Sequence, residues 1–187
     1  MVKKLVQVAL LIALVMLPQK ISAESIADSS ANLVSGKVIF AESEYAELHI
    51  KREAIREVLI KHNSPLVEEV DAFISACTKY NIDCFLLPSI SGLESSYGKK
   101  FLKGSHNPFG WGGGYILFNS WSDCFHAVAR GLRNNYYNRG ADTINKIAPI
   151  YAESKTWAER VSSIRTQFQK KEQELLNSSS LISLNLP

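Results

Sequence analysis

Residues 92–114, GLESSYGKKFLKGSHNPFGWGGG, contain a single carboxylate, that of Glu94, followed by glycines, aromatic residues and small polar residues. No other acidic residue occurs before Asp123. A carboxyl group can protonate the leaving oxygen of a glycosidic bond when its surroundings keep it protonated. Glu94 is therefore a candidate general acid, although a Glu at the end of a helix is more often a solvated side chain.

The element expected to carry Glu94 favours the protonated carboxyl group. Pro88 fits the first turn of a helix that begins near Leu86 and continues until Gly98. Glu94 then lies near the C-terminal end of a short and mostly apolar helix. There the helix dipole disfavours a negative charge and apolar neighbours desolvate it.

The missing partner carboxylate restricts the chemistry. The usual glycosidase mechanisms need a second carboxylate, roughly 5 Å away for a nucleophile or roughly 6.5–9.5 Å away for a base. A sugar with a 2-acetamido group removes this need, because its carbonyl oxygen can attack the anomeric carbon. A lone Glu94 therefore favours N-acetylhexosamine polymers, of which peptidoglycan and chitin are the common extracellular examples.

Aromatic residues are concentrated in the same part of the chain, and aromatic faces with a polar edge suit sugar rings. The glycines at 110 and 112–114 permit close backbone approach to a ligand and movement of a lid. Trp111, between glycines, is the best binding candidate, whereas Phe118 and Trp121 are better explained as core. The aromatic residues of this region are Tyr97, Phe109, Trp111, Tyr115, Phe118 and Trp121.

The first half of the remaining sequence predicts helices. Residues 24–40 begin with small polar residues and are expected to form a linker, and residues 41–63 have the apolar spacing of an N-terminal helix. Ser64 is a good N-cap for a second helix, with Pro65 at its first position. That helix is expected to end near Asn81.

The second half predicts a hairpin and three further helices. The glycines of residues 99–121 and the strand-like composition of residues 115–118 predict a loop and a small β-hairpin. Ser122 is the expected cap of the next helix, a short helix follows, and Ser154 caps the last one. Residues 171–187 are expected to be its charged end and a loose tail. The sum is an α+β, mainly helical domain with a hairpin beside a cleft.

Three motifs resemble the glucosaminidase family of bacterial cell-wall hydrolases, in the lysozyme-like superfamily. ESSYG at 94–98 resembles the family's helix end, and NPFGW at 107–111 resembles its following loop. IAPIYA at 147–152, with Trp157, is similar to the tyrosine segment and the tryptophan of the final helix. The order and spacing of these motifs match over residues 64–168.

This resemblance implies a lysozyme-like fold for residues 64–170 and cleavage of the β-1,4 bond between N-acetylglucosamine and N-acetylmuramic acid. It implies Glu94 as general acid and Tyr151 as a residue that steadies developing positive charge or orients the acetamido group. The expected partner is the peptidoglycan glycan strand, without cofactor or metal. The substrate-binding residues implied are Ser95, Tyr97, Asn107, Phe109, Trp111 and Tyr115.

Members of the family often have a second acidic residue on the hairpin, which this chain lacks. Asp123 and Glu153 are candidate substitutes, although an acidic residue such as Asp123 also suits a helix start for dipole reasons. A lytic transglycosylase, which uses one Glu and forms an anhydro-sugar, is the nearest alternative, but its Gly-Leu-Met-Gln segment is absent. A non-catalytic glycan-binding domain and a structural exported protein are the others.

The first 23 residues have the pattern of a secretory signal peptide: two lysines, an apolar run of 13 residues, then Pro18 and a small-residue site at Ala23. The run is shorter than the ~20 residues of a membrane-spanning helix. We therefore expect a secreted or cell-envelope monomer, in contact with the membrane only if the signal stays uncleaved. Its removal would leave 18 basic and 18 acidic side chains, a balance that does not favour nucleic acid.

Three cysteines, Cys77, Cys84 and Cys124, form an odd set in a chain expected to be exported. That compartment allows one disulfide with one thiol left over, but the sequence does not select the pair. Cys124 and His126 are close enough to suggest zinc. No second pair at ligand spacing accompanies them, so we expect no metal site.

Overall fold

The computed structural model describes residues 23–184, with the side chains of residues 42–180. The chain divides into two units, Met1–Glu44 and Tyr45–Pro187, and the candidate site belongs to the second. Apart from Ala23, the expected signal segment lies outside the described residues. Over the described range, no helix is long and apolar enough to cross a membrane.

Helix α2, Ala23–Lys61, contains both the segment expected as a linker and most of the expected N-terminal helix. In the second unit this helix buries four residues whose spacing places them on one face, Ala54, Ile55, Val58 and Leu59. It is followed by Asn63, whose φ of 49° is left-handed. The chain then turns into the rest of the domain.

Ser64 caps the next helical segment, as its position predicts. Its Oγ accepts a hydrogen bond of 3.0 Å from the backbone N–H of Leu66, at the start of the 3₁₀ helix η1, Pro65–Glu69. Helix α3, Val70–Tyr80, follows directly and ends at Asn81, which is left-handed with φ 48°. Phe73 of α3 stacks on Phe125, so α3 is tied into the core.

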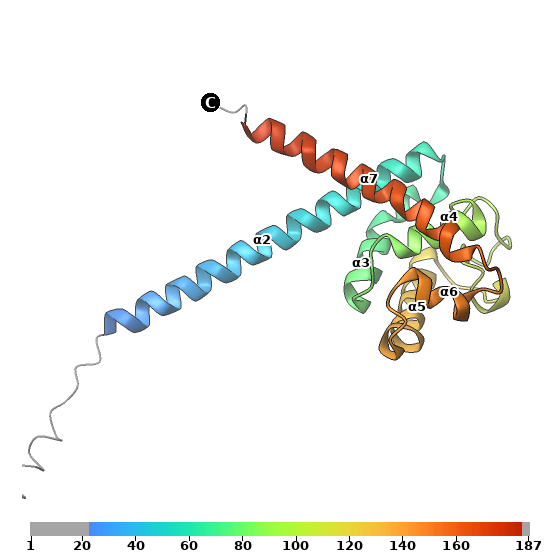
Figure 1. The fold of residues 1–187 in the computed structure, drawn as a ribbon, viewed down its shortest axis with the longest axis horizontal. Coiled ribbons are helices and arrows are strands. Elements are labelled where there is room, and N and C mark those ends of the chain that lie inside the picture. Colours follow the sequence, from blue (N-terminus) through green and yellow to red (C-terminus); the bar gives the residue numbers. More distant parts are fainter. Residues whose placement is uncertain (1–22, 185–187) are drawn as a thin grey trace, which may run out of the picture. The chain divides into compact units, whose positions relative to one another are not determined.

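Four further α-helices complete the domain. Helix α3 packs against α5, while α7 packs against both α4 and α6 (Figure 1). The buried aromatic rings Phe85, Phe109, Phe125 and Phe168 belong to the core that these helices share. The remaining elements are α4, Leu86–Ser95; η2, Trp111–Gly114; α5, Trp121–Asn135; η3, Tyr137–Arg139; α6, Ile144–Tyr151; and α7, Trp157–Leu184.

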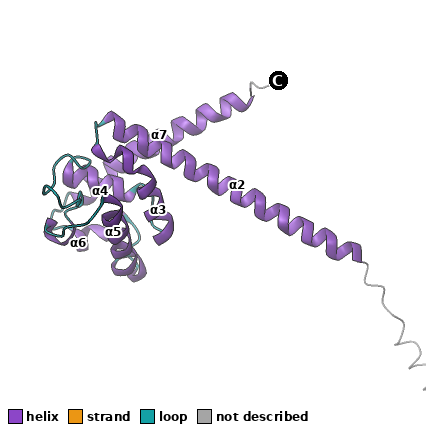
Figure 2. Ribbon diagram, turned by 180° about the vertical axis from the view of Figure 1, so that it is seen from behind, coloured by secondary structure: helices purple, strands orange, loops and turns teal. Residues whose placement is uncertain are grey.

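The expected β-hairpin does not form, and the α+β, lysozyme-like fold class is therefore wrong. The part of the chain that the structure describes consists of helices and loops without a strand (Figure 2). The mainly helical part of the expectation agrees with the structure. Residues 99–120 instead form turns and the short helix η2.

The conformation of the glycines explains why a strand is not formed. Gly112, Gly113 and Gly114 have φ values of 62°, 76° and 84°, a left-handed conformation that winds the chain into turns. The strand-like residues that follow have no strand to pair with, and Tyr115 and Leu117 are exposed. One backbone hydrogen bond, from Phe118 N to Ser105 O at 2.9 Å, closes the loop where a ladder was expected.

Two helix boundaries also differ from expectation. Ser120, rather than Ser122, caps α5, since its Oγ accepts a hydrogen bond of 3.0 Å from Asp123 N. Helix α7 continues through the charged residues and into the expected tail, to Leu184. The first difference moves the start of α5 toward the N-terminus, and the second extends α7 into the segment expected to be a loose tail.

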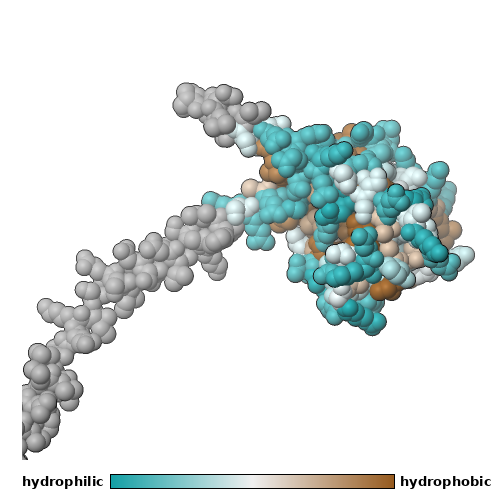
Figure 3. Space-filling view, in the orientation of Figure 1, coloured by the Kyte–Doolittle hydropathy of each residue, from teal (hydrophilic) through white to brown (hydrophobic). Residues whose placement is uncertain are grey.

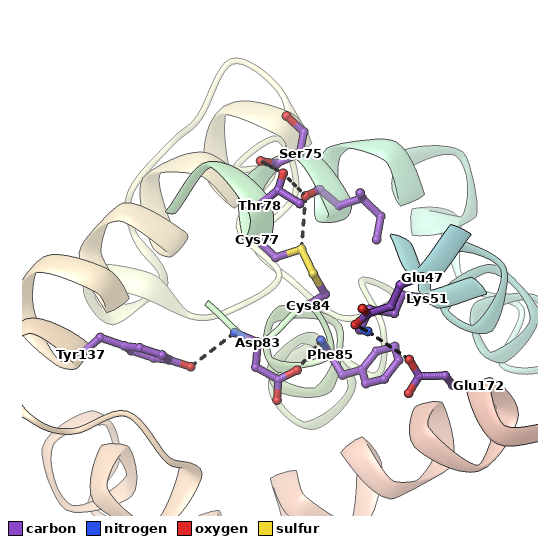
Figure 4. The surroundings of a disulfide bond; sticks show 11 residues. Glu47, Lys51, Ser75, Cys77, Thr78, Asp83, Cys84, Phe85, Tyr137 and Glu172 are labelled. Atoms are coloured by element: carbon purple, nitrogen blue, oxygen red, sulfur yellow. Dashed lines mark hydrogen bonds and ion pairs between the residues drawn. A yellow bond between two sulfur atoms is a disulfide. The ribbon is translucent and has the colours of Figure 1, made fainter. Parts of the chain in front are cut away.

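A disulfide joins Cys77, near the end of α3, to Cys84, just before α4 (Figure 4). Asp83 beside it accepts a hydrogen bond of 3.0 Å from Phe85 N and forms an ion pair with Arg165 of α7. The disulfide and Asp83 thus fix the connection that leads into α4. This connection sets where α4, and with it Glu94, begins.

An ion pair at 3.2 Å links Lys51 of α2 to Glu172 of α7, and both residues are drawn in Figure 4. A second pair, Lys171 with Glu57 at 3.1 Å, joins the same two helices. The face of the molecule drawn in Figure 3 is mainly hydrophilic, with separate hydrophobic patches. Two ion pairs therefore link α2 to α7.

Candidate active site

Glu94 lies in the last turn of α4, close to the position expected from the sequence. Most of α4 is buried, but the Glu94 side chain is exposed, and Ser96 ends the helix in a left-handed conformation with φ 52°. A mostly buried helix thus presents one exposed carboxyl group, so the desolvation by apolar neighbours that the sequence led us to expect is not found. The helix provides a rigid support for that group.

One carboxyl oxygen of Glu94 is held by a tryptophan. The indole Nε1–H of Trp157 donates a hydrogen bond of 2.8 Å to Oε1. Trp157 begins α7 and is buried, with 3% of its surface exposed. No described residue makes a hydrogen bond to Oε2, so this oxygen is left for a ligand.

Tyr151, at the end of α6, packs against Trp157 with ring centroids 4.8 Å apart. Its hydroxyl donates a hydrogen bond of 3.1 Å to the backbone oxygen of Phe109. Burial, with a smaller effect from the charge of Glu94, raises the pKa of the Tyr151 phenol well above its ordinary value. Tyr151 is therefore a neutral donor near Glu94, and its hydroxyl holds the loop that contains Phe109.

Asn107 organises the loop from within. Its Nδ2 donates to the backbone oxygen of Trp111 at 2.9 Å, and its Oδ1 accepts from the backbone N–H of Trp111 at 3.0 Å. Asn107 is buried, so its amide stabilises the turn instead of facing solvent. The loop residue expected to bind substrate is a structural clamp for the glycine-rich segment.

Glu94 and this loop line a pocket of about 280 Å³. Among the described residues of its lining, Glu94 supplies the one carboxylate and Lys100 the one ammonium group. Tyr115 contributes an exposed ring. The lining residues are Glu94, Ser95, Lys100, Phe101, Leu102, Asn107, Pro108, Gly110, Gly113, Gly114 and Tyr115.

Trp111, the best binding candidate from the sequence, packs against the protein and is not among these lining residues. Its ring is 6.0 Å from that of Tyr151. A Cβ atom added at Gly131 of α5 would lie 2.4 Å from the Trp111 ring, so the indole rests directly on the α5 backbone. Gly131 is the residue that permits this contact.

Two other predicted binding residues, Ser95 and Phe109, serve the fold. The Ser95 hydroxyl donates to Ser91 O at 2.9 Å and accepts from Gly98 N at 2.8 Å, which closes the end of α4. Phe109 is buried against Phe125, and only its backbone oxygen reaches Tyr151. Ser95 borders the pocket, but its hydroxyl is already satisfied.

Tyr97 is also part of the core. Its ring stacks on His62 at 4.2 Å, and its hydroxyl has no hydrogen-bond partner in the described structure. Burial raises the pKa of this phenol to about 12. We therefore assign Tyr97 to packing and not to ligand binding.

Neither candidate for a second carboxylate lines the pocket. Asp123 is exposed in the first turn of α5, and Glu153 is exposed after α6. The free cysteine, Cys124, is buried and contacts Asn107 Oδ1 at 4.0 Å, whereas His126 faces Ser75 at 3.4 Å. Cys124 and His126 thus have different partners.

From the sequence, Trp157 was named only through the family resemblance, without a role at Glu94, and Lys100 was not singled out. The available signal for Trp157 was chemical: a buried indole N–H needs an acceptor, and a lone carboxylate is a strong one. For Lys100 the signal was its place six residues after Glu94 in a segment without acidic residues. Neither signal could be interpreted without knowing which helices and loops pack together.

A larger groove, of about 590 Å³, lies between α2 and α7. Its carboxylates Glu57 and Glu174 are paired with Lys171, and it contains no aromatic residue. This arrangement serves helix packing, so the smaller pocket beside Glu94 is the better candidate site.

No protein-family model matches the chain, and no curated protein matches it either.

Proposed function

We propose that this protein is a peptidoglycan hydrolase that cleaves β-1,4 glycosidic bonds of N-acetylhexosamine polymers, with Glu94 as general acid. The observation that carries the proposal is the state of the Glu94 carboxyl group. One oxygen is bound by Trp157 at 2.8 Å, and the other has no partner among the described residues. A single oriented carboxyl group at the edge of a pocket is what the reaction needs.

In this mechanism the proton resides on Oε2, because the indole N–H occupies Oε1. Glu94 transfers the proton to the glycosidic oxygen as the bond to the anomeric carbon breaks. The carbonyl oxygen of the 2-acetamido group forms a bond to that carbon and balances its developing positive charge. Water then opens the resulting ring, and its proton returns to Glu94.

The lining of the pocket supports this route over a two-carboxylate route. Glu94 is the one carboxylate among the described lining residues, and Asp123 and Glu153 are not part of that lining. A base for direct water activation would have to lie roughly 6.5–9.5 Å from the acid. The substrate's own acetamido group takes over the role of the missing protein nucleophile.

The same single Glu suits a lytic transglycosylase, so the products are the test of reaction type. The purified protein is incubated with peptidoglycan, and the ends of the released fragments are identified by mass spectrometry. Reducing ends are the expected result, whereas 1,6-anhydro ends would show that the reaction is transglycosylation and not hydrolysis. Binding to peptidoglycan without any released fragment would indicate that the protein is a glycan-binding domain and not an enzyme.

Substrate assistance has its own test. De-N-acetylated glycan lacks the carbonyl oxygen that attacks the anomeric carbon, so we expect the protein to cleave it at least about 100-fold more slowly. Re-acetylation of the same material should restore cleavage. Equal rates on both forms would overturn the assisted mechanism while leaving Glu94 as the acid.

A further inference from the structure

The segment between Glu94 and Asp123 carries three lysines, at positions 99, 100 and 103, and no acidic residue. The three ammonium groups differ in their contacts. Nζ of Lys99 donates to His62 O at 2.7 Å and thus ties the loop to the domain. In the part of the chain that the structure describes, no carboxylate pairs with Lys100 or Lys103.

Lys100 is the one of these three that lines the pocket beside Glu94. Its backbone is fixed, because its N–H donates at 2.8 Å to the backbone oxygen of Ser95, the last residue of α4. Its position relative to Glu94 is therefore set by the end of one helix. The pocket that contains Glu94 is thus also lined by a lysine that has no carboxylate partner in the described part of the chain.

Apart from Glu94 and Lys100, the exposed residues of the lining carry no charge. Leu102 and Tyr115 are 52% and 82% exposed and offer apolar surface to the body of a ligand. Sugar rings bring hydroxyl and amide groups, which do not require an ammonium partner. A lysine at this position is suited to a ligand that carries a negative charge in addition to its sugar rings.

Peptidoglycan carries such a charge at a defined place. Its muramic acid bears a lactyl group, whose carboxylate is free or is extended by a peptide stem that has carboxylates of its own. We propose that Lys100 binds a carboxylate of this lactyl-peptide arm, and so selects the charged polymer over neutral N-acetylhexosamine polymers. This inference rests on the function proposed above and names the feature of the substrate that the site recognises.

The test measures binding without turnover, in the full chain with Glu94→Gln. Cosedimentation with insoluble peptidoglycan, extracted free of other anionic wall polymers, is compared with cosedimentation on peptidoglycan whose carboxylates have been amidated. We expect Lys100→Gln to weaken binding to the native polymer about threefold to tenfold and to leave binding to the amidated polymer unchanged. Lys103→Gln, an exposed lysine outside the lining, is the matched control and should keep the difference between the two polymers.

Amidase-treated peptidoglycan, which retains only the lactyl carboxylate, identifies the source of the charge. A Lys100→Gln effect that persists on this material assigns the contact to the lactyl carboxylate, and one that disappears assigns it to the peptide stem. An equal loss on native and amidated polymer, or no loss, would overturn the inference. Failure of the wild-type protein to release fragments would overturn the enzymatic proposal separately, because this assay requires no cleavage.

Discussion

The indole Nε1 of Trp157 lies 2.8 Å from Oε1 of Glu94 and joins the first turn of α7 to the last turn of α4. The donor is itself immobilised, since Trp157 is buried against Tyr151. This bond distinguishes the two oxygens of the carboxyl group. Oε1 accepts the indole hydrogen bond, and Oε2 has no partner among the described residues.

Removal of that donor should impair turnover more than folding. Trp157→Phe keeps an aromatic ring beside Tyr151 but has no N–H, so the carboxyl group loses its fixed orientation. We expect kcat to fall about tenfold, equivalent to roughly 1.4 kcal/mol, with little change in KM. Steady-state kinetics on soluble glycan fragments measure both constants, and an unchanged kcat would exclude a positioning role.

The bond itself has a spectroscopic signature. The chain contains three tryptophans, so three indole N–H resonances are expected in an NMR spectrum. Glu94→Leu should shift one of them strongly, because it removes the acceptor. Glu68→Leu, at an exposed position on η1, is the control and should shift none.

Tyr151→Phe tests the contact between the tyrosine and the loop. The variant keeps the ring but loses the hydrogen bond to Phe109 O, so we expect a loss of about 1 kcal/mol in the free energy of unfolding. Turnover should fall several-fold as the loop loses its support. Tyr136→Phe is the control, since that ring also packs on Tyr151 while its hydroxyl has no described partner.

If Tyr151→Phe and Tyr136→Phe both turn over at the wild-type rate, Tyr151 is a core residue only. Denaturant unfolding and fragment release, measured on the same preparations, separate the two effects. A stability loss without a loss of turnover would remove Tyr151 from the catalytic account.

Tyr97 offers a pH-dependent test of its assignment to the core. Burial raises the pKa of its phenol from 10.0 to about 12. The unfolded chain ionises first, so stability is intact below about pH 10 and is lost as the pH rises toward 12. Between about pH 9 and about pH 11, the free energy of unfolding of Tyr97→Phe should therefore fall by about 1 kcal/mol less than that of wild type.

Urea unfolding at the two pH values measures this difference. Tyr115→Phe, at an 82% exposed position, should follow the wild type over the same range. Identical pH dependence of Tyr97→Phe and wild type would show that the phenol is open to solvent, and would return Tyr97 to the list of candidate ligand contacts.

The disulfide predicts how many thiols react in denaturant and how much it contributes to the free energy of unfolding. One thiol per chain, that of Cys124, should react in denaturant before reduction, and three should react after it. Replacing Cys77 and Cys84 by Ala should lower the free energy of unfolding by about 2.5 kcal/mol, because the seven-residue separation closes a short loop in the unfolded chain. Three reactive thiols before reduction would contradict the pairing.

The sequence was informative where local rules determine structure. Ser64 and Pro65 identified a helix start through capping, and apolar spacing identified the buried face of α2. Glu94 was expected near the end of its helix for the same reason and lies there. These features depend on neighbours within one or two turns, so they can be read from the chain alone.

The failures concern contacts between distant segments. A strand at 115–118 needs a partner strand, and the positive φ values of Gly112–Gly114 wind the chain away from one. Trp157 is 63 residues from Glu94, and its role depends on how α7 packs on α4. Sequence spacing likewise did not reveal that the side chains of Asn107 and Ser95 form hydrogen bonds with the backbone.

The central claim is that Glu94 is the proton donor for glycosidic cleavage. The most direct measurement is the rate of fragment release from peptidoglycan by wild type, Glu94→Gln and the exposed-site control Glu68→Gln, with equal folding verified by circular dichroism. We predict that Glu94→Gln reduces the rate by about 100-fold or more and that Glu68→Gln leaves it unchanged. Equal release by Glu94→Gln and wild type would contradict the account.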